Sequence, residues 1–230
     1  MSSPTGDPSI FKVLHEDPHS KARTGVLNTA RGAIQTPVFM PVGTQATVKT
    51  ISNRELLDAG AQVVLANTYH LYLRPGPEII REMGGLHSFM NWPKPILTDS
   101  GGFQIFSLST LIRLQEEGVE FRSHIDGSKH FLTPEKVVRV QEALGSDILM
   151  PLDECVSYPK DKEYTEKSLG LTQRWARLSK DAWLDAKKQN AYGKPNLLFG
   201  IVQGGTYPDL RERAAKEMAE MDFPGYSIGG

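Results

Sequence analysis

Residues 95–108 read PILTDSGGFQIFSL, and this stretch decides how the rest of the chain is interpreted. A short apolar strand ends at Asp99, and Ser100 and two glycines follow before apolar residues resume at Phe103. A core strand gains nothing from a carboxylate at its end, and ordered glycines cost backbone entropy. The stretch therefore predicts a strand that presents a carboxylate, with bare backbone beside it, to a flat ligand.

Similar apolar segments recur along the chain, at residues 37–42, 62–67, 95–98, 147–152, 197–202 and 225–228. Helical segments separate them, at residues 52–60, 75–85, 133–145, 162–189 and 206–221. The strands are nearly continuous apolar runs, as in parallel sheets that are covered on both faces. No dinucleotide fingerprint or phosphate loop is present. We therefore predict the α/β class and a (β/α)8 TIM-type barrel, truncated here to about six βα units.

The ends of several predicted elements carry specific signals. N-caps are expected at Ser52 or Asn53, at Thr133 and at Thr206. Residues 11–42 indicate an N-terminal antiparallel β-sheet, and Asp126-Gly127 within residues 119–132 indicates a hairpin with a tight turn. The predicted domains are a disordered N-terminus over 1–10 and an incomplete TIM-type barrel catalytic domain over 11–230.

Composition limits the classes of function. The 230 residues carry a net charge of −1, so a nucleic-acid partner must be held by a local basic patch. Cys155 is the single cysteine, which excludes a disulfide framework or a cysteine-based metal site within this chain. No apolar run approaches the roughly 20 residues of a membrane span, so we expect no membrane partner and a cytoplasmic location.

Polar residues and glycines follow the predicted strands, at 67–70, 99–102, 153–155, 203–205 and 229–230. Active sites of α/β barrels lie at these carboxyl ends. Asp99 and Asp153 could act as a proton acceptor and a recognition carboxylate, while Gln203 supplies an amide. Together with glycine backbone, this set suits the edge of a purine-like base.

Simpler interpretations exist for each of these residues. Asp99 could be a helix N-cap, and Asp153 with Glu154 could form a solvated loop. Cys155 fits a small buried hydrophobe better than a nucleophile. Three histidines lack metal-ligand spacing and are expected to be structural or solvent-facing: His70, His124 and His130. The charged helix over 162–189 is typical of a solvated surface. The coincidence of several polar strand ends favours function.

Seven ordered motifs resemble the tRNA-guanine transglycosylases (queuine tRNA-ribosyltransferases) of the bacterial type, from about Phe11 onward. They are TPVFMPVGT, ANTYHLYLRPG, ILTDSGGFQIFSLS, VEFRSHIDGSKHFLTPE, GSDILMPLDEC, GIVQGG and YSIGG. The resemblance implies a barrel with an N-terminal β-sheet and a zinc-bearing insert. The implied reaction exchanges the wobble guanine of a tRNA anticodon for a 7-deazaguanine base through a covalent ribosyl-enzyme intermediate.

The resemblance also implies residue roles. Asp99 corresponds to the proton acceptor, Phe103 to the stacking aromatic and Asp153 to the residue that binds the pyrimidine edge of the base. The other implied substrate-binding residues are Ser100, Gly101, Gly102, Cys155, Gln203, Gly204, Gly229 and Gly230. In the family, the nucleophilic aspartate and the zinc ligands follow the SIGG motif. The chain is therefore expected to be an N-terminal portion without nucleophile or metal ligands, and to be inactive alone.

The form of two motifs suggests the substrate. Cys155 after Asp-Glu, together with DSGGFQ, resembles enzymes that take 7-aminomethyl-7-deazaguanine, in place of queuine or the 7-cyano base. The implied partners are a tRNA with a GUN anticodon and a second copy of the chain in a homodimer. Two alternatives stay open: a non-catalytic partner subunit of a transglycosylase, or a barrel hydrolase that acts on a nucleoside or sugar.

Overall fold

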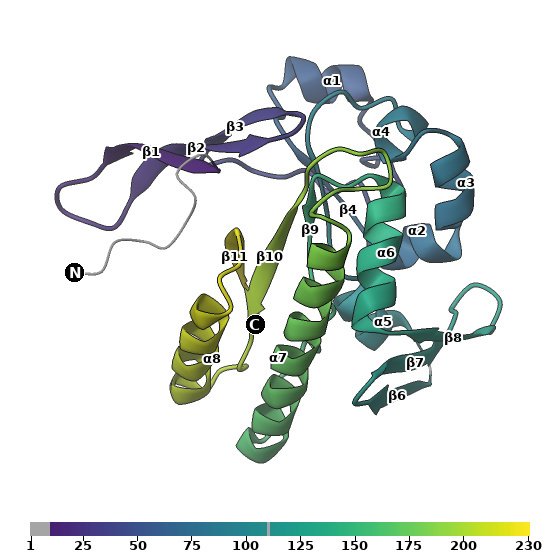
Figure 1. Ribbon diagram of the computed structural model, residues 1–230, viewed down its shortest axis with the longest axis vertical. Coiled ribbons are helices and arrows are strands. Elements are labelled where there is room, and N and C mark those ends of the chain that lie inside the picture. Colours follow the sequence, from purple (N-terminus) through teal and green to yellow (C-terminus); the bar gives the residue numbers. More distant parts are fainter. Residues whose placement is uncertain (1–9, 110) are drawn as a thin grey trace.

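The computed structural model describes residues 10–109 and 111–230 (Figure 1). Its centre is a five-stranded sheet in the order β11-β10-β9-β5-β4, with all neighbours parallel. The strands are β4 (Val64–Ala66), β5 (Ile96–Thr98), β9 (Ile148–Leu149), β10 (Leu197–Val202) and β11 (Gly225–Ile228). The predicted parallel α/β arrangement is confirmed for these five strands.

The sixth predicted strand, residues 37–42, does not form as a strand. Only a parallel bridge between Val42 and Leu65 remains of it. Pro37 and Pro41 have no N–H to donate, which explains why a regular ladder stops there. The Pro41 carbonyl still accepts from the Leu65 N–H at 2.9 Å, so the segment lies along the β4 edge. The described residues form an open sheet of five parallel strands and no closed barrel, so the α/β class is confirmed and the truncated barrel stays a prediction.

The five predicted helices are present: α1 (Asn53–Asp58), α3 (Pro77–Glu82), α6 (Pro134–Leu144), α7 (Lys162–Asp185) and α8 (Pro208–Glu220). Ser52 caps α1 in a capping box with Glu55, and Thr133 caps α6. The predicted cap at Thr206 is wrong, because the N-cap of α8 is Tyr207, whose side chain makes no capping hydrogen bond. Helix α7 ends four residues earlier than predicted, before Lys187 and Lys188 take positive φ angles.

Three short helices were not predicted: α2 (Thr68–Leu73), α4 (Leu86–Phe89) and α5 (Gly102–Leu108). Helices α2 and α5 follow β4 and β5 almost directly. Gly101 turns the chain into α5 with a left-handed φ of 82°, which a residue with a side chain rarely adopts. The apolar residues that resume at Phe103 therefore belong to helix α5, in which the Ile105 side chain is fully buried.

Two antiparallel sheets flank the parallel one. The predicted N-terminal sheet is confirmed as β1 (Phe11–Glu16), β2 (Arg23–Thr29) and β3 (Gly32–Thr36), which extends from the body (Figure 1). The predicted hairpin is confirmed within a second sheet of β6 (Ile112–Gln115), β7 (Gly118–Arg122) and β8 (Lys129–Leu132). Its turn is wider than predicted, because residues 123–128 all lie between the paired Arg122 and Lys129.

Disorder was predicted for residues 1–10. Residues 1–9 lie outside the described part of the chain, so this stays a prediction for them. Ile10 is described, and its carbonyl accepts a hydrogen bond from the Asn28 N–H at 2.7 Å. The antiparallel N-terminal sheet is therefore anchored from Ile10 onward.

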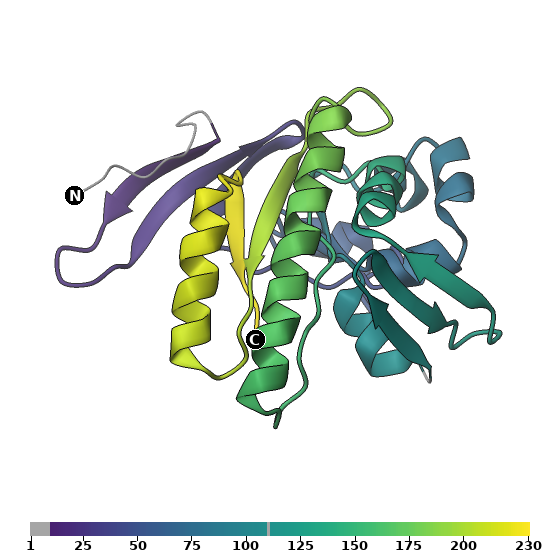
Figure 2. The same ribbon diagram turned by 60° about the horizontal axis from the view of Figure 1, so that its bottom comes forward.

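The central strands are buried on both faces, which explains their continuous apolar sequences. One face contributes Leu97, Ile148 and Ile201 to a core that also includes Ile34 of the N-terminal sheet. The other face packs under helices, with Leu149 and Leu198 among its residues. Helices α7 and α8 lie side by side on that face in both views (Figures 1 and 2).

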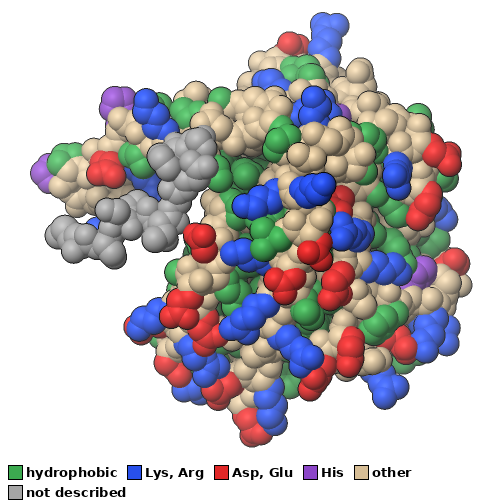
Figure 3. Space-filling view, viewed as in Figure 1, with side chains coloured by type: hydrophobic (Ala, Val, Ile, Leu, Met, Phe, Trp, Pro, Cys, Tyr) green, Lys and Arg blue, Asp and Glu red, His purple; other side chains and the backbone are tan. Residues whose placement is uncertain are grey.

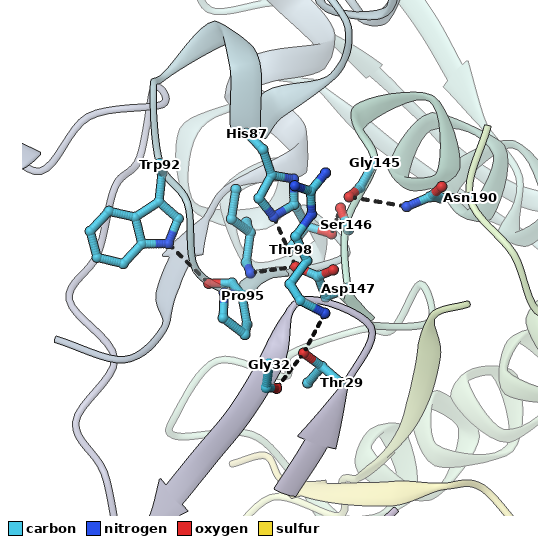
Figure 4. Close-up of polar contacts among 12 residues, drawn as sticks. Thr29, Gly32, His87, Trp92, Pro95, Thr98, Gly145, Ser146, Asp147 and Asn190 are labelled. Atoms are coloured by element: carbon cyan, nitrogen blue, oxygen red, sulfur yellow. Dashed lines mark hydrogen bonds and ion pairs between the residues drawn. The ribbon is translucent and has the colours of Figure 1, made fainter. Parts of the chain in front are cut away.

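Polar contacts fasten the amino-terminal end of the sheet. His87 of α4 and Asp147, which precedes β9, are both buried and lie 2.9 Å apart between Nε2 and Oδ2 (Figure 4). The same Asp147 oxygen accepts from the Ile96 N–H at 2.8 Å. Ser146, which also precedes β9, accepts from the hydroxyl of Thr98, the last residue of β5, at 2.8 Å. This end of the sheet is thus fixed by internal bonds, opposite the end where the candidate site lies.

Candidate functional site

A cavity of about 230 Å³ opens at the carboxyl ends of the central strands. Its polar walls come from the loop after β5 and from Asp153, which follows β9. The residues that line it are Met40, Leu65, Leu97, Asp99, Ser100, Gly101, Gly102, Phe103, Met150, Asp153, Ile201 and Ser227. The cavity therefore combines two carboxylates with apolar walls, as small-molecule sites commonly do.

Asp99 is held by the neighbouring strand end. Its carboxylate accepts hydrogen bonds from the side-chain amide of Asn67, from the Thr68 N–H at 3.0 Å and from the Gly101 N–H at 3.1 Å. Burial raises the pKa of Asp99 to about 6, although the bonds from Asn67, Thr68 and Gly101 act in the opposite direction. A carboxylate with a pKa close to neutrality is suited to accept and return a proton.

Asp153 lies at the inner wall and is 6% exposed. Ser100 donates to its Oδ1 at 2.9 Å, and the Gln203 amide donates to its Oδ2 at 2.7 Å. Burial raises the pKa of Asp153, and the charge of Glu154 adds to this effect, while the bonds from Gln203 and Ser100 oppose it. Residues that follow β5, β9 and β10 thus converge on one carboxylate.

The two glycines after Ser100 are required by close packing. A Cβ on Gly102 would lie 2.5 Å from the Asp153 carbonyl oxygen and 2.9 Å from its Oδ1. A Cβ on Gly101 would lie 2.9 Å from the Tyr69 nitrogen. The absence of a side chain thus lets Gly102 approach Asp153 and lets Gly101 approach Tyr69. Phe103, the next residue, lines the cavity while 61% of its surface is exposed, so its ring is accessible at the mouth.

Gly229 lies behind the cavity, against the residues that support Asp153. The Gly229 N–H donates to the Val202 carbonyl at 2.9 Å, and a Cβ on Gly229 would lie 2.7 Å from the Gln203 amide nitrogen. Arg211 of α8 donates to the Gly229 carbonyl at 2.9 Å. These contacts hold Gly229 against the amide that supports Asp153.

Cys155 contacts the residue after Gly229. Its thiol donates to the Gly230 carbonyl at 3.1 Å. Burial raises the pKa of the Cys155 thiol, and the nearby charges of Asp153 and Glu154 raise it further. A raised pKa disfavours the thiolate, which is the reactive form of cysteine.

The structure brings most of the predicted site residues together. Residues 99–103 and Asp153 line the cavity, and Gln203, Gly229, Gly230 and Cys155 form the bonded layer beside it. Gly204 is different: it packs against the start of α8, where a Cβ would lie 2.9 Å from the Arg211 nitrogen. Gly204 thus shapes the turn and does not line the cavity.

Several residues of the site lie outside the set predicted from the sequence. Asn67 and Thr68 were noted only as a polar strand end, although they hold Asp99. The apolar lining from Met40, Met150 and Ile201 was not assigned to the site. The strand-end position of Asn67 was the available signal, because parallel neighbours end at the same edge of a sheet.

The histidines have structural contacts. His124 Nδ1 lies 2.8 Å from the Tyr69 hydroxyl, and His130 Nδ1 lies 3.2 Å from the Tyr72 hydroxyl. Among residues 10–109 and 111–230, no group of three or more His, Cys, Asp or Glu side chains could hold a metal ion. The described residues therefore do not fit the zinc site that the resemblance implies. In the same part of the chain, no helix is long and apolar enough to cross a membrane.

The fold and cavity define an α/β protein with a carboxylate-lined site for a small polar ligand at its strand ends. The family model for queuine tRNA-ribosyltransferase matches residues 17–230, so the chain belongs to this family. This membership agrees with the family resemblance noted from the sequence motifs.

Three curated relatives, each named queuine tRNA-ribosyltransferase, show the extent of the similarity. The protein from Thermoanaerobacter sp. (strain X514) is 60% identical over 220 residues, which cover 96% of this chain and 57% of the relative. The protein from Desulforamulus reducens is 57% identical over 97% of this chain and 58% of its own length. The protein from Symbiobacterium thermophilum is 55% identical over 96% of this chain and 53% of its own length. The chain thus spans little more than half the length of these relatives.

Proposed function

We propose that the chain binds a 7-deazaguanine base and contributes this pocket to the exchange of a guanine in tRNA, a step of queuosine biosynthesis. The observation that carries the proposal is the position of Asp153, a buried carboxylate fixed by Ser100 and Gln203 at the wall of the cavity. A guanine-type edge offers a ring N–H and an exocyclic amino group, and a carboxylate accepts from both. Charge-assisted bonds of this kind are the stronger ones.

The other walls suit the rest of the base. Phe103 offers an accessible ring for stacking, and Gly101 and Gly102 leave backbone beside the cavity. Gln203 and Gly229 would complete recognition of the edge through amide and backbone groups, with Gly230 and Cys155 behind them. A flat heterocycle could stack on the Phe103 ring while its polar edge meets Asp153.

Asp99 is proposed as the proton acceptor. In the exchange, guanine leaves the ribose C1′ when a nucleophile bonds to that carbon. The incoming base then loses its N9 proton, and N9 bonds to C1′ as the nucleophile departs. Asp99 would take that N9 proton, because its pKa of about 6 lets it hold the proton and release it near neutrality. Neither Asp99 nor Asp153 is assigned as the nucleophile.

The finer parts of the proposal concern the whole protein. The five parallel strands are proposed to belong to a (β/α)8 barrel, with residues 37–42 along one edge and β11 at the other. The substrate would be a tRNA with a GUN anticodon and the incoming base 7-aminomethyl-7-deazaguanine, in a cytoplasmic homodimer. No step is assigned to zinc, since the described residues do not fit a metal site.

A calorimetric titration of this chain with 7-aminomethyl-7-deazaguanine tests the proposal. Asp153→Asn should weaken binding by roughly tenfold or more, because a charge-assisted bond contributes about 1.5–3 kcal/mol. Asp161→Asn is the matched control, since Asp161 is an exposed helix cap. No binding by the folded wild-type chain would contradict the proposal, and so would equal affinity of the Asp153 variant. A tRNA-independent nucleoside hydrolase activity would favour the hydrolase alternative.

A further inference from the structure

The sheet β6–β8 has one face that the core does not use. Its inner residues Val119, Phe121 and Leu132 are at most 1% exposed and pack in a cluster with Tyr69, Ile105 and Leu152. These three partners follow the carboxyl ends of β4, β5 and β9. The sheet therefore covers the end of the molecule that holds the cavity, and its other face points to solvent.

The side chains of that outer face are identified by the strand register. Arg113 pairs with Glu120, Glu120 with Phe131, and Arg122 with Lys129. Because side chains opposite one another in a sheet share a face, these five residues form one surface, called here the outer hairpin face. A cavity of about 280 Å³ opens along it. Its lining comprises Leu111, Ile112, Arg113, Glu120, Phe121, Arg122 and Lys129.

The charges of the outer hairpin face do not cancel. Lys129 Nζ pairs with Glu120 Oε2 at 2.7 Å, which neutralises both. Arg122 uses Nη1 for the Gly127 carbonyl at 2.9 Å, but no carboxylate of a described residue lies within 4 Å of the Arg113 or Arg122 guanidinium. Asp126 in the adjoining loop keeps its negative charge, because the hydrogen bonds from Ser128, one of them at 2.7 Å, lower its pKa; it lies outside the outer hairpin face. The face keeps a net positive charge on a chain whose total is −1.

On the face formed by α7 and α8, several basic side chains are paired with acids. Lysines and arginines on α7 and α8 are interspersed with acids, as Figure 3 shows over the face that these helices form. Lys162 pairs with Asp209 at 2.7 Å, and Arg213 pairs with Glu166 at 2.6 Å. The prediction that the charged helix is a solvated surface agrees with this pattern. On the outer hairpin face, neither arginine has a carboxylate partner, and Arg122 uses only Nη1, for the Gly127 carbonyl, so guanidinium N–H groups remain for an anion.

We propose that the outer hairpin face binds the phosphate backbone of the RNA whose base enters the Asp99 cavity. This inference rests on the proposed function. The guanidinium groups of Arg113 and Arg122 present forked N–H donors that match phosphate oxygens. Helix α5 lies between the two sites in the chain, and its seven residues rise about 10 Å. The arginines would therefore meet phosphates a few nucleotides away from the nucleotide whose base enters the Asp99 cavity. RNA is the occupant that the uncancelled positive charge and the shared end of the molecule both favour.

The test is a salt titration of tRNA binding by the full chain. Fluorescence anisotropy with a labelled, unmodified tRNA transcript would be measured between 50 and 200 mM KCl for wild type and for Arg113→Gln with Arg122→Gln. Each lost phosphate contact lowers the slope of log affinity against log salt by about 0.7–0.9, so the pair should lower it by about 1.5. Affinity at 50 mM KCl should fall by roughly tenfold.

Arg31→Gln with Arg54→Gln is the matched control, because both arginines are exposed on other elements and their loss changes the net charge equally. Three outcomes would each overturn the inference. The two double variants could change tRNA binding equally, or the wild-type chain could fail to bind tRNA. Polyglutamate, an acidic polypeptide, could also displace the labelled tRNA as well as unlabelled tRNA does. Circular dichroism establishes that each variant is folded. Calorimetry with the 7-deazaguanine base separates the two hypotheses. If the wild-type chain binds the base but its tRNA binding does not depend on the hairpin arginines, this inference alone is refuted. If the wild-type chain does not bind the base, the proposed function is refuted.

Discussion

The Ser100 hydroxyl joins two strand ends, because it donates to Asp153 Oδ1 at 2.9 Å and accepts from the Gly102 N–H at 3.1 Å. One small side chain thus fixes both the recognition carboxylate and the first residue of α5. Gln203 fixes the other carboxylate oxygen from β10. The polar floor of the cavity is therefore a connected network, in which the loss of one member leaves a buried partner unsatisfied.

The first prediction concerns this hydroxyl. Ser100→Ala should weaken binding of the 7-deazaguanine base by about tenfold, since Asp153 loses a donor and gains freedom to rotate. Calorimetry at neutral pH measures the change. Ser107→Ala is the control, because Ser107 is exposed on the nearby helix α5 and donates only to the Gln104 carbonyl, at 3.4 Å. Equal affinities of wild type and Ser100→Ala would contradict the assigned role.

The second prediction compares two glycines. Gly102→Ala should destabilise the fold by about 1–3 kcal/mol, because its Cβ would lie 2.5 Å from the Asp153 carbonyl oxygen. Gly170→Ala should instead stabilise it by about 0.5–1 kcal/mol, since no atom lies within 4 Å of the added Cβ and the site is inside α7. Urea unfolding of both variants gives the comparison. A stable Gly102→Ala variant with intact base binding would show that the cavity wall can shift.

The third prediction concerns the pH dependence caused by Asp99. Burial raises its pKa from 3.8 to about 6, so between these values the folded state binds more protons than the unfolded state. The contribution of Asp99 to stability is therefore fully present below pH 3.8 and is lost as the pH rises through about 6. Asp99→Asn should lack this part of the stability–pH curve. Urea unfolding from pH 3.5 to 7 measures the difference between wild type and variant.

A direct titration complements the stability curve. Carbon NMR of labelled aspartate should show a carboxyl that titrates near pH 6 in wild type and is absent from Asp99→Asn. Asn67→Ala should move this midpoint upward, because the amide of Asn67 favours the charged carboxylate. A midpoint close to 4 would mean that the Asp99 carboxylate is better solvated than the structure indicates.

Local signals in the sequence predicted the elements whose ends they fix. Helix α6 begins after Thr133, has Pro134 at its first position and ends at Gly145 with a left-handed φ of 81°, as expected from these residue types. The parallel strands were predictable because burial on both faces leaves continuous apolar runs. Elements that tertiary packing decides were missed. Helix α5 contains β-favouring residues and begins at the second of two glycines, and the burial of Ile105 in the core stabilises it.

The candidate site was predictable as a set of residues but not as a network. Each of Asp99, Asp153 and Gln203 follows an apolar strand, so their convergence could be inferred from the fold class. Which atoms bond could not be inferred, because Asn67 and Asp99 are 32 positions apart and meet only through the pairing of β4 with β5. The strand predicted at residues 37–42 is wrong for a reason that the sequence does contain. Pro37 and Pro41 argue against a regular strand, but the prediction followed the apolar pattern of the segment.

The last prediction concerns the single thiol. Burial and two neighbouring carboxylates raise the pKa of Cys155, and its thiol donates to the Gly230 carbonyl at 3.1 Å. Because the thiolate is the reactive species, alkylation by iodoacetamide at pH 8 should be at least about tenfold slower in the folded chain than in urea. Mass spectrometry gives an unambiguous rate, since the chain has one cysteine. Bound 7-deazaguanine base should slow the alkylation further, because it would cover the side of the cavity next to Cys155. Rapid alkylation of the folded, base-bound chain would place Cys155 outside the site.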